Sequence, residues 1–208
     1  MVARRIGAIA AMTLTCALLP PAAQAGGETA GQTTPVDAAL LAKANAGDAA
    51  AQVAVGESYI QAAPTAHNRV RISSDYQQAA AWYKKAADQN NIGGELHLAA
   101  LYRDGAGKAF PRDPAQAAAL YRKAANQGDA GAQGTLGMLY TLGLGVPQSD
   151  VEAYFWLDLA ASVKGPNQAR YAANRQNVGT RITVDELQDV QDRVVAWQAA
   201  HPRPGATR

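Results

Sequence analysis

Three histidines, one group of carboxylates and one glycine–lysine pair are the residues of this chain whose types could support chemistry. The histidines are His67, His97 and His201, and no two of them have the close spacing of a zinc-binding helix. The carboxylates are Asp185, Asp189 and Asp192. They share one face of a predicted helix whose opposite face is apolar, so a solvated surface explains them better than acid–base catalysis in a pocket. We therefore predict no metal site and no catalytic carboxylate.

The glycine–lysine pair, Gly107-Lys108, does not complete a phosphate-binding loop. That loop needs an earlier glycine where Tyr102 stands, and a serine or threonine where Ala109 stands. The Gly-x-Ser-x-Gly pattern of a nucleophilic serine is also absent from the sequence. From these residues we predict that the protein is not an enzyme and takes no cofactor.

The N-terminal segment, residues 1–25, has the three parts of a secretory signal peptide in order. Arg4 and Arg5 form a basic start, residues 6–19 form an apolar run, and Ala23-Gln24-Ala25 is a small-residue cleavage motif. We expect cleavage after Ala25 and a periplasmic or secreted protein. A retained membrane anchor is the alternative, but the run is shorter than the roughly 20 apolar residues that a membrane span needs.

Charge and cysteine content narrow the partners of the mature chain. The full sequence has 19 Lys and Arg against 17 Asp and Glu, and removal of Arg4 and Arg5 leaves a formal net charge of zero. Nucleic-acid binding needs a positive field, so we expect no nucleic-acid partner. The single cysteine, Cys16, lies in the signal segment, which leaves the mature chain without a thiol. Residues 26–34 have no apolar periodicity and predict a disordered leader.

A repeating helical hairpin organises the remainder. Tyr59, Tyr102 and Tyr140 take one position of successive first helices and are 43 and 38 residues apart. The expected caps of the second helices, Asp75, Asp113 and Ser149, follow these tyrosines after 16, 11 and 9 residues. If the third turn is the reference, the first two turns hold insertions of 7 and 2 residues, and without them the unit is 36 residues both times. A period of that size indicates a solenoid of stacked helix pairs.

The domain organisation follows from this unit. We predict a solenoid over residues 35–164, with a half-repeat at 35–46 and repeats at about 47–90, 91–127 and 128–164. The half-repeat helix is expected to start at Thr34-Pro35. Two capping helices follow over 165–201, the second opened by a capping box of Thr183 and Glu186, and residues 202–208 form a disordered tail. No strand pattern occurs, so the fold class is all-α.

Several side chains are assigned to packing within this solenoid. Gly137 is expected at a close contact between two helices, where a bulky residue would not fit. The aromatic residues at repeat positions are interpreted as core rather than as a ligand site; they are Trp82, Tyr83, Tyr121, Tyr154 and Trp156.

The residues of the third repeat carry a family resemblance. Ala132-Gln133, Leu136-Gly137, Tyr140 and Gly145-Val146, with the preceding Ala124-Ala125-x-x-Gly128 run, resemble the Sel-one-like repeat family, a branch of the tetratricopeptide-type solenoids. The resemblance covers roughly residues 36–164. It implies a right-handed α-solenoid of antiparallel helix pairs with C-terminal capping helices.

The resemblance also implies binding rather than catalysis. Family members are mostly adaptors that present a concave helical surface to another protein, so we expect a non-catalytic scaffold of the cell envelope. A periplasmic immunity protein that neutralises a secreted effector is the alternative. An enzyme or binder acting on peptidoglycan or β-lactams is a weaker alternative, because no nucleophile, metal set or poised acid–base pair is present. The oligomeric state stays open.

Two groups of residues are candidates for partner binding. Non-signature positions of the first helices are expected to line the concave groove; they are Ala54, Glu57, His97, Arg103, Thr135, Met138 and Thr141. The predicted insertion within residues 61–74 is locally basic and adds Arg69 and Arg71. Such an insertion often maps to the binding face of a solenoid, although a tolerated surface loop is an equal explanation.

Overall fold

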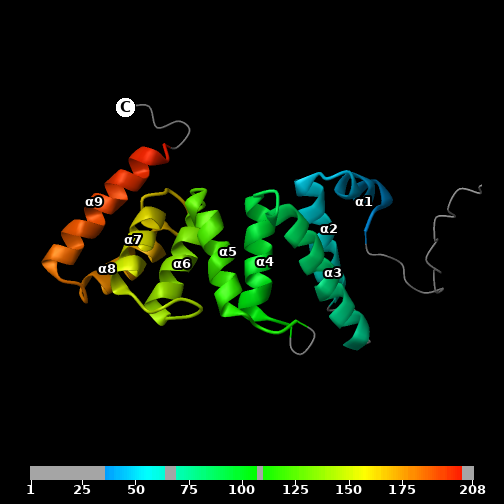
Figure 1. The fold of residues 1–208 in the computed structure, drawn as a ribbon, viewed down its shortest axis with the longest axis horizontal. Helices are drawn as coiled ribbons and strands as arrows, with labels where there is room; N and C mark the ends of the chain where they lie inside the picture. The colour runs from blue at the N-terminus through cyan, green and yellow to red at the C-terminus, as the bar shows by residue number, and fades with distance from the viewer. Residues whose placement is uncertain (1–35, 64–68, 107–109, 203–208) are drawn as a thin grey trace, which may run out of the picture. The chain divides into compact units, whose positions relative to one another are not determined.

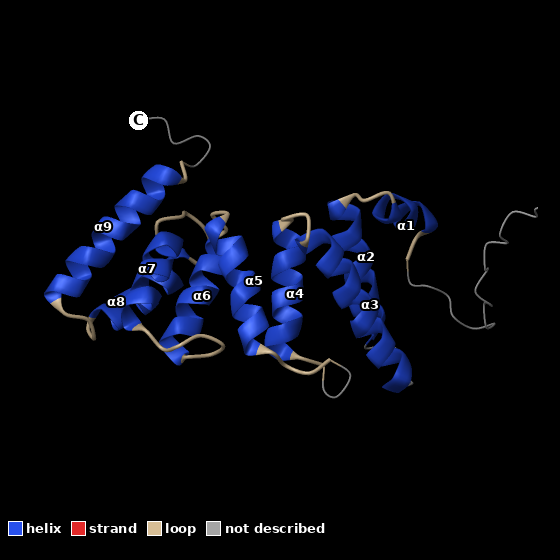
Figure 2. Ribbon diagram, in the orientation of Figure 1, coloured by secondary structure: helices blue, strands red, loops and turns tan. Residues whose placement is uncertain are grey.

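The computed structural model describes residues 36–63, 69–106 and 110–202. Within these ranges the chain forms nine α-helices and no strand, apart from an isolated bridge between Ala106 and Phe110 (Figure 2). The predicted signal peptide, the leader, His67, Gly107-Lys108 and the last six residues of the tail lie outside the described residues. The helices are α1 (Ala38–Asn45), α2 (Ala49–Ala62), α3 (Arg69–Ala87), α4 (Ile92–Asp104), α5 (Pro114–Asn126), α6 (Ala130–Leu142), α7 (Asp150–Ala161), α8 (Gln168–Gly179) and α9 (Val184–Ala200).

From α1 to α8 the helices pack in chain order, each against the next. Helices α2 and α3, α4 and α5, and α6 and α7 form successive pairs, and α3 with α4 and α5 with α6 join one pair to the next (Figure 1). Helices α8 and α9 both pack on α7 at the C-terminal end. This arrangement confirms the predicted all-α solenoid of stacked helix pairs. None of the helices in the described ranges is long and apolar enough to cross a membrane.

The first helix of each pair begins at an equivalent capping residue. The side chains of Asp48, Asn91 and Asp129 each accept a hydrogen bond from a backbone N–H in the first turn of α2, α4 and α6. The tyrosines that defined the period, at 59, 102 and 140, each lie eleven residues after that cap. The three tyrosines therefore occupy one structural position, as the sequence predicted.

The second helices differ from the prediction in the first repeat. Asp113 and Ser149 cap α5 and α7 as predicted, whereas Asp75 lies inside α3 and caps nothing at its start. Helix α3 has 19 residues, against 13 in α5 and 12 in α7. The added segment contains no Gly or Pro from Arg69 to Ser74, so nothing in it interrupts helical hydrogen bonding. The insertion lengthens a helix instead of forming a turn.

At the N-terminal end of the stack the start of the first helix differs from the prediction, and at the C-terminal end the predicted capping box is confirmed. Helix α1 begins at Ala38 with Asp37 as its N-cap, not at Thr34-Pro35, because the Asp37 carboxylate accepts the Leu40 N–H. At the other end the capping box is present. The Thr183 hydroxyl accepts the Glu186 N–H at 3.3 Å, and the Glu186 carboxylate accepts the Thr183 N–H at 2.8 Å.

Small residues allow the close helix contacts of the stack. A side-chain carbon on Gly137 of α6 would lie 2.7 Å from Cγ of Leu157 in α7, which confirms the predicted close contact. Gly56 of α2 is equivalent, and a carbon there would lie 2.5 Å from the ring of Tyr83. Four of the five repeat aromatics are buried and Tyr154 is half-buried, so their assignment to the core is correct.

A buried polar position recurs in the first helices. Gln52 and Gln133 each donate a side-chain hydrogen bond to a backbone carbonyl eight residues earlier, at Ala44 and Ala125, over 3.1 Å. The equivalent residue of α4 is Glu95, which is fully buried and accepts a hydrogen bond from Gln127 at 2.7 Å. Burial raises the pKa of Glu95, while Lys123 and the Gln127 hydrogen bond oppose that rise.

Candidate protein-binding surface

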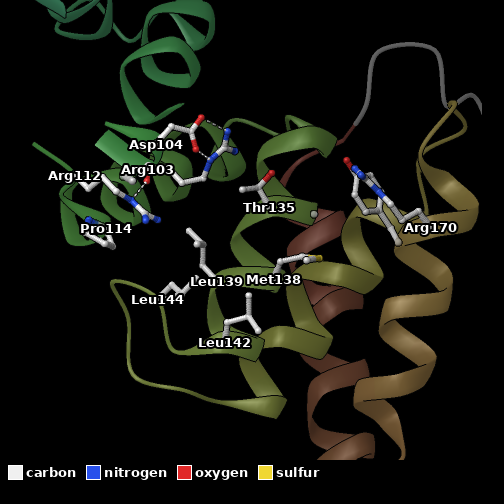
Figure 3. A pocket seen from close by; sticks show the side chains of 13 residues that line it. Arg103, Asp104, Arg112, Pro114, Thr135, Met138, Leu139, Leu142, Leu144 and Arg170 are labelled. Atoms are coloured by element: carbon white, nitrogen blue, oxygen red, sulfur yellow. Dashed lines mark hydrogen bonds and ion pairs between the residues drawn. The ribbon is translucent and has the colours of Figure 1, made fainter. Parts of the chain in front are cut away.

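Three exposed apolar side chains gather at the end of α6. Met138 and Leu142 lie on α6, and Leu144 lies in the turn that follows it; 42%, 58% and 43% of their surfaces are exposed. All three line one pocket of about 370 Å³. Figure 3 shows them together with Leu139. We call this feature the α6 pocket, and it is walled by residues of α4, α5, α6 and α8.

Two glycines set the walls of the α6 pocket. A side-chain carbon at Gly134 of α6 would overlap the ring of Tyr171, so the missing side chain lets α8 pack closely against α6. Gly145, with φ of 74°, lies against the Pro114 carbonyl at the start of α5, where a side chain would also overlap. A positive φ and this close approach both favour glycine. The turn after α6 is thereby held against α5, and Leu144 of that turn lines the pocket.

Arg103 and Asp104 form the pocket wall contributed by α4. The Arg103 guanidinium donates two hydrogen bonds of 2.8 Å to the Asp104 carboxylate and a third, of 3.0 Å, to the Tyr121 hydroxyl. The hydrogen bonds from Arg103 hold the pKa of Asp104 below its ordinary value, and the charges of Arg103 and Arg112 lower it further. The charge of the Asp104 carboxylate is therefore balanced within the protein by Arg103.

Two further arginines stand at the pocket. Arg112 donates from Nε to the Arg103 carbonyl at 2.7 Å, and Arg170 of α8 lies over the ring of Tyr171, with 5.3 Å from its guanidinium carbon to the ring centroid. Figure 3 shows Arg112 and Arg170 on opposite sides of the apolar side chains. Three arginines thus line the pocket with a single carboxylate.

Part of the predicted partner-binding set meets at this pocket. Arg103, Thr135 and Met138 all line it, although they come from two different helices. Thr141, also on α6, is turned to its own helix, where its hydroxyl donates to the Gly137 carbonyl at 2.9 Å. Thr141 is not among the residues that line the pocket.

Glu57 and His97 meet at a different place. The His97 ring stacks on Tyr83 with centroids 4.9 Å apart, and its Nε2 lies 3.1 Å from the Glu57 carboxylate. Burial raises the pKa of Tyr83, and the Glu57 charge raises it further. Glu57, Tyr83 and His97, which we call the α2–α4 cluster, therefore interact with one another through a ring stack and an ion pair.

The remaining candidates lie at the start of α3. Arg69 and Arg71 belong to the first turn of this helix, not to a loop as predicted, and their side chains lie outside the described part. Ala54 is half-buried on α2. Ala54 does not line the α6 pocket.

Sequence reasoning assigned only three of the thirteen residues that line the pocket to partner binding. Among those it missed are Leu142, Leu144, Arg112 and Arg170. Leu142 and Leu144 did leave a signal, since two leucines alternate with glycines at the end of a helix and in the turn after it, where polar residues are usual. Arg112 and Arg170 left none. Arg170 joins the pocket only because α8 folds back onto the end of the stack, and the repeat period does not cover that helix.

The described residues contain no group of three or more His, Cys, Asp and Glu side chains that could hold a metal ion. Asp185, Asp189 and Asp192 of α9 are exposed, and Arg193 of the same helix pairs with Glu152 of α7 at 2.7 Å. The α6 pocket itself presents apolar surface and fixed positive charge. Such a surface suits the binding of another molecule more than bond-making chemistry.

Comparison with known proteins adds the family and the fold. The family model for the Sel1 repeat matches residues 66–91, 94–129 and 130–162. A Sel1 repeat protein from Oxalobacter formigenes is similar in structure, with 25% identity and a TM-score of 0.54, over 67% of this chain and 96% of that one. The protective antigen c5321 of uropathogenic Escherichia coli, which displays an SLR fold, has 23% identity and a TM-score of 0.52 over 81% of this chain. The matched region spans 44% of c5321. The comparison with curated proteins gave no match.

Proposed function

We propose that this chain, a Sel1-repeat protein, is a non-catalytic scaffold that binds another protein at the α6 pocket. Sel1 repeats generally mediate protein–protein interaction and generally serve as non-catalytic scaffolds. Stacked, capped helix pairs also suit this role physically. The surface exists before the partner arrives, so little conformational entropy is lost from the scaffold on binding.

The exposure of Met138, Leu142 and Leu144 side by side is the observation that supports this site. Among the described residues only two other large apolar side chains, Val184 and Val195, are exposed to that extent, and both lie on α9. Exposed apolar side chains that cluster beside a pocket and are bordered by polar residues mark interaction sites, whereas scattered ones need no explanation. Two further pockets of the described residues, one beside Tyr154 and Leu187 and one beside Leu98 and Tyr102, lack such a cluster.

The proposal extends to the cell envelope as the place of action. Its support is the N-terminal sequence, with Arg4 and Arg5, the apolar run and the Ala23–Ala25 motif ahead of Gly26. Expression of the full chain in a Gram-negative host, followed by periplasmic extraction and N-terminal sequencing, tests this part. A periplasmic product that starts at Gly26 supports it, and an uncleaved cytoplasmic product contradicts it.

Site-specific photo-crosslinking tests the binding surface. A photoreactive phenylalanine analogue replaces Leu142, and the matched control carries it at Val195, an apolar residue on α9 that is exposed to at least the same extent. We expect a discrete protein adduct from the Leu142 position in the native envelope and none from the Val195 position. Adducts that are equal at both positions, or absent at both, contradict the proposal. An adduct with an exported toxin would assign the scaffold to neutralisation rather than to assembly.

A further inference from the structure

The charges around the α6 pocket are unequal. Arg103 is neutralised by Asp104, since the two form a salt bridge of 2.8 Å. Arg112 and Arg170 have no such partner in the described ranges: the first bonds a backbone carbonyl and the second lies over an aromatic ring. The pocket therefore carries an excess of two positive charges, although the mature chain as a whole is neutral.

The position of these charges is as informative as their number. Arg112 precedes α5 and Arg170 lies on α8, and Figure 3 shows the apolar side chains between them. The pocket volume of about 370 Å³ is at the small end of the range of about 300–1,000 Å³ for ligand pockets, which suits one or two side chains more than a whole helix. A complementary ligand has an apolar centre with negative charge on both sides.

We propose that the α6 pocket recognises an acidic segment of a partner protein in which a large apolar side chain is flanked on both sides by aspartates or glutamates. The inference rests on the proposed function and adds the chemistry of the partner. The apolar side chain enters between Met138 and Leu142, and carboxylates on its two sides reach Arg112 and Arg170. Arginine suits this role because its planar guanidinium can bind a carboxylate through two parallel hydrogen bonds.

The chain's own unplaced segments do not have this chemistry. Residues 26–34 contain no large apolar residue, and residues 203–208 contain two arginines and no acid. A second copy is the nearest competitor, because the exposed face of α9 has acidic residues beside Val184. That face offers valine rather than a larger side chain, so we commit to a separate partner and let the test decide.

Fluorescence anisotropy with mature protein, residues 26–208, provides the test. The probe is a short fluorescein-labelled peptide with an amidated C-terminus, in which adjacent leucine and phenylalanine are flanked on both sides by glutamates. One control peptide has lysine for every glutamate, and the other has serine for the leucine and phenylalanine. We expect the probe to bind at least about tenfold more tightly than either control, and to weaken as salt is raised.

Variants test whether the acidic probe binds at the α6 pocket. Arg112→Gln with Arg170→Gln is expected to weaken binding of the probe by at least about tenfold, because both opposed charges are lost. Lys43→Gln with Lys164→Gln removes the same charge from exposed sites outside the pocket and should leave binding unchanged. Leu142→Ser should also weaken binding, against Val195→Ser as its control. Thermal unfolding shows that each variant is folded, and Arg170→Gln alone serves if the Arg112 change unfolds the protein.

The outcomes separate the two proposals. Equal binding of the lysine peptide, or an unchanged affinity in the arginine variant, overturns the inference. If analytical ultracentrifugation shows self-association that Asp185→Asn with Asp189→Asn abolishes, the occupant is a second copy and the inference is also overturned. A protein adduct at Leu142 whose crosslinked segment is not acidic contradicts the inference but agrees with the proposed function. If no adduct forms at Leu142 and the peptide does not bind, both the inference and the proposed function are contradicted.

Discussion

Two successive junctions of the stack use the same helix position in different ways. His97 of α4 and Thr135 of α6 each lie six residues after the N-cap of their helix. At the first junction His97 stacks on Tyr83 and pairs with Glu57, so the surface is filled by the protein's own side chains. We call this the closed junction, and the second one, which follows, the open junction. At the second junction Thr135 lines the α6 pocket, and Tyr121, the equivalent of Tyr83, accepts a hydrogen bond from Arg103.

The two junctions show which residues of such a repeat protein can determine its specificity for a partner. The signature residues build the same backbone at both junctions. Whether the surface is closed or open depends on residues outside the signature, such as His97 at the first junction and Thr135 at the second. A shared scaffold can thus carry one occupied surface and one available surface.

The largest expected effect comes from Gly137→Leu, which removes the support of the open junction. The new side chain would collide with Leu157 and with the Ala153 carbonyl, and overpacking of this kind costs about 3 kcal/mol or more. A chain of this size loses roughly 2–4 °C of Tm for each kcal/mol. Met138→Leu, on the next residue, is the control and should leave the melting curve in place. If both variants melt like the parent, the described packing of α6 on α7 is wrong.

The second junction could be closed by copying the side chains of the first. Ala100→Glu with Thr135→His places the glutamate and histidine of the α2–α4 cluster at the equivalent positions beside Tyr121. We expect the histidine to fill the α6 pocket, which would weaken binding of the acidic probe about tenfold while the Tm stays nearly constant. Ala100→Gln with Thr135→Ser is the matched control. Undiminished binding in the histidine variant would show that the pocket is not the site.

Glu95→Gln would make the buried polar position of α4 match that of α2 and α6. A glutamine there could accept from Gln127 and donate to the Ala87 carbonyl, as Gln52 accepts from Gln89 and donates to Ala44. We expect a gain of about 1 kcal/mol at neutral pH. The parent, whose Glu95 pKa is raised by burial, loses stability as pH rises from the unfolded pKa through the folded one. Chemical denaturation at several pH values should show the gain vanish in acid, and a gain that is constant with pH would contradict this.

The smallest effect is expected from opening the closed junction. Glu57→Gln removes one half-exposed partner of His97, and such pairs contribute less than about 1 kcal/mol. Binding of the acidic probe should not change, because Glu57 does not line the α6 pocket. Anisotropy and thermal unfolding of the same sample check both statements. A large loss of binding would place the partner on the first junction.

The fold was predictable because its signals are local and repeated. Tyr59, Tyr102 and Tyr140, with their eleven-residue spacing from a capping Asp or Asn, specify the first helices without reference to the rest of the chain. The second helix of repeat one was predicted wrongly for the same reason. Asp75 resembles the other caps, but a residue caps a helix only where the chain before it stops being helical, and the Arg69–Ser74 segment does not stop.

The binding surface was predictable only in part. Arg103, Thr135 and Met138 lie on repeat helices, so the period placed them on one side of the stack. Arg170 and Tyr171 reach the same pocket through the packing of α8, which depends on Gly134 being small and on nothing that recurs in the sequence. Contacts of this tertiary kind leave no periodic trace.

The way α9 passes back to α7 has a consequence for local opening of the molecule. Helix α7 is contacted by α6, α8 and α9, whereas α1 packs substantially on α2 alone and α9 on α7 alone. Glu152 near the start of α7 is tied to α9 through Arg193, and Asp150 is tied to Arg181 in the turn before α9. In a stack whose stability is a sum over neighbours, opening spreads inward from the helices with the fewest of them. Amide hydrogens of α1 and α9 should therefore exchange with solvent before those of α7, so that the chain opens from its two ends.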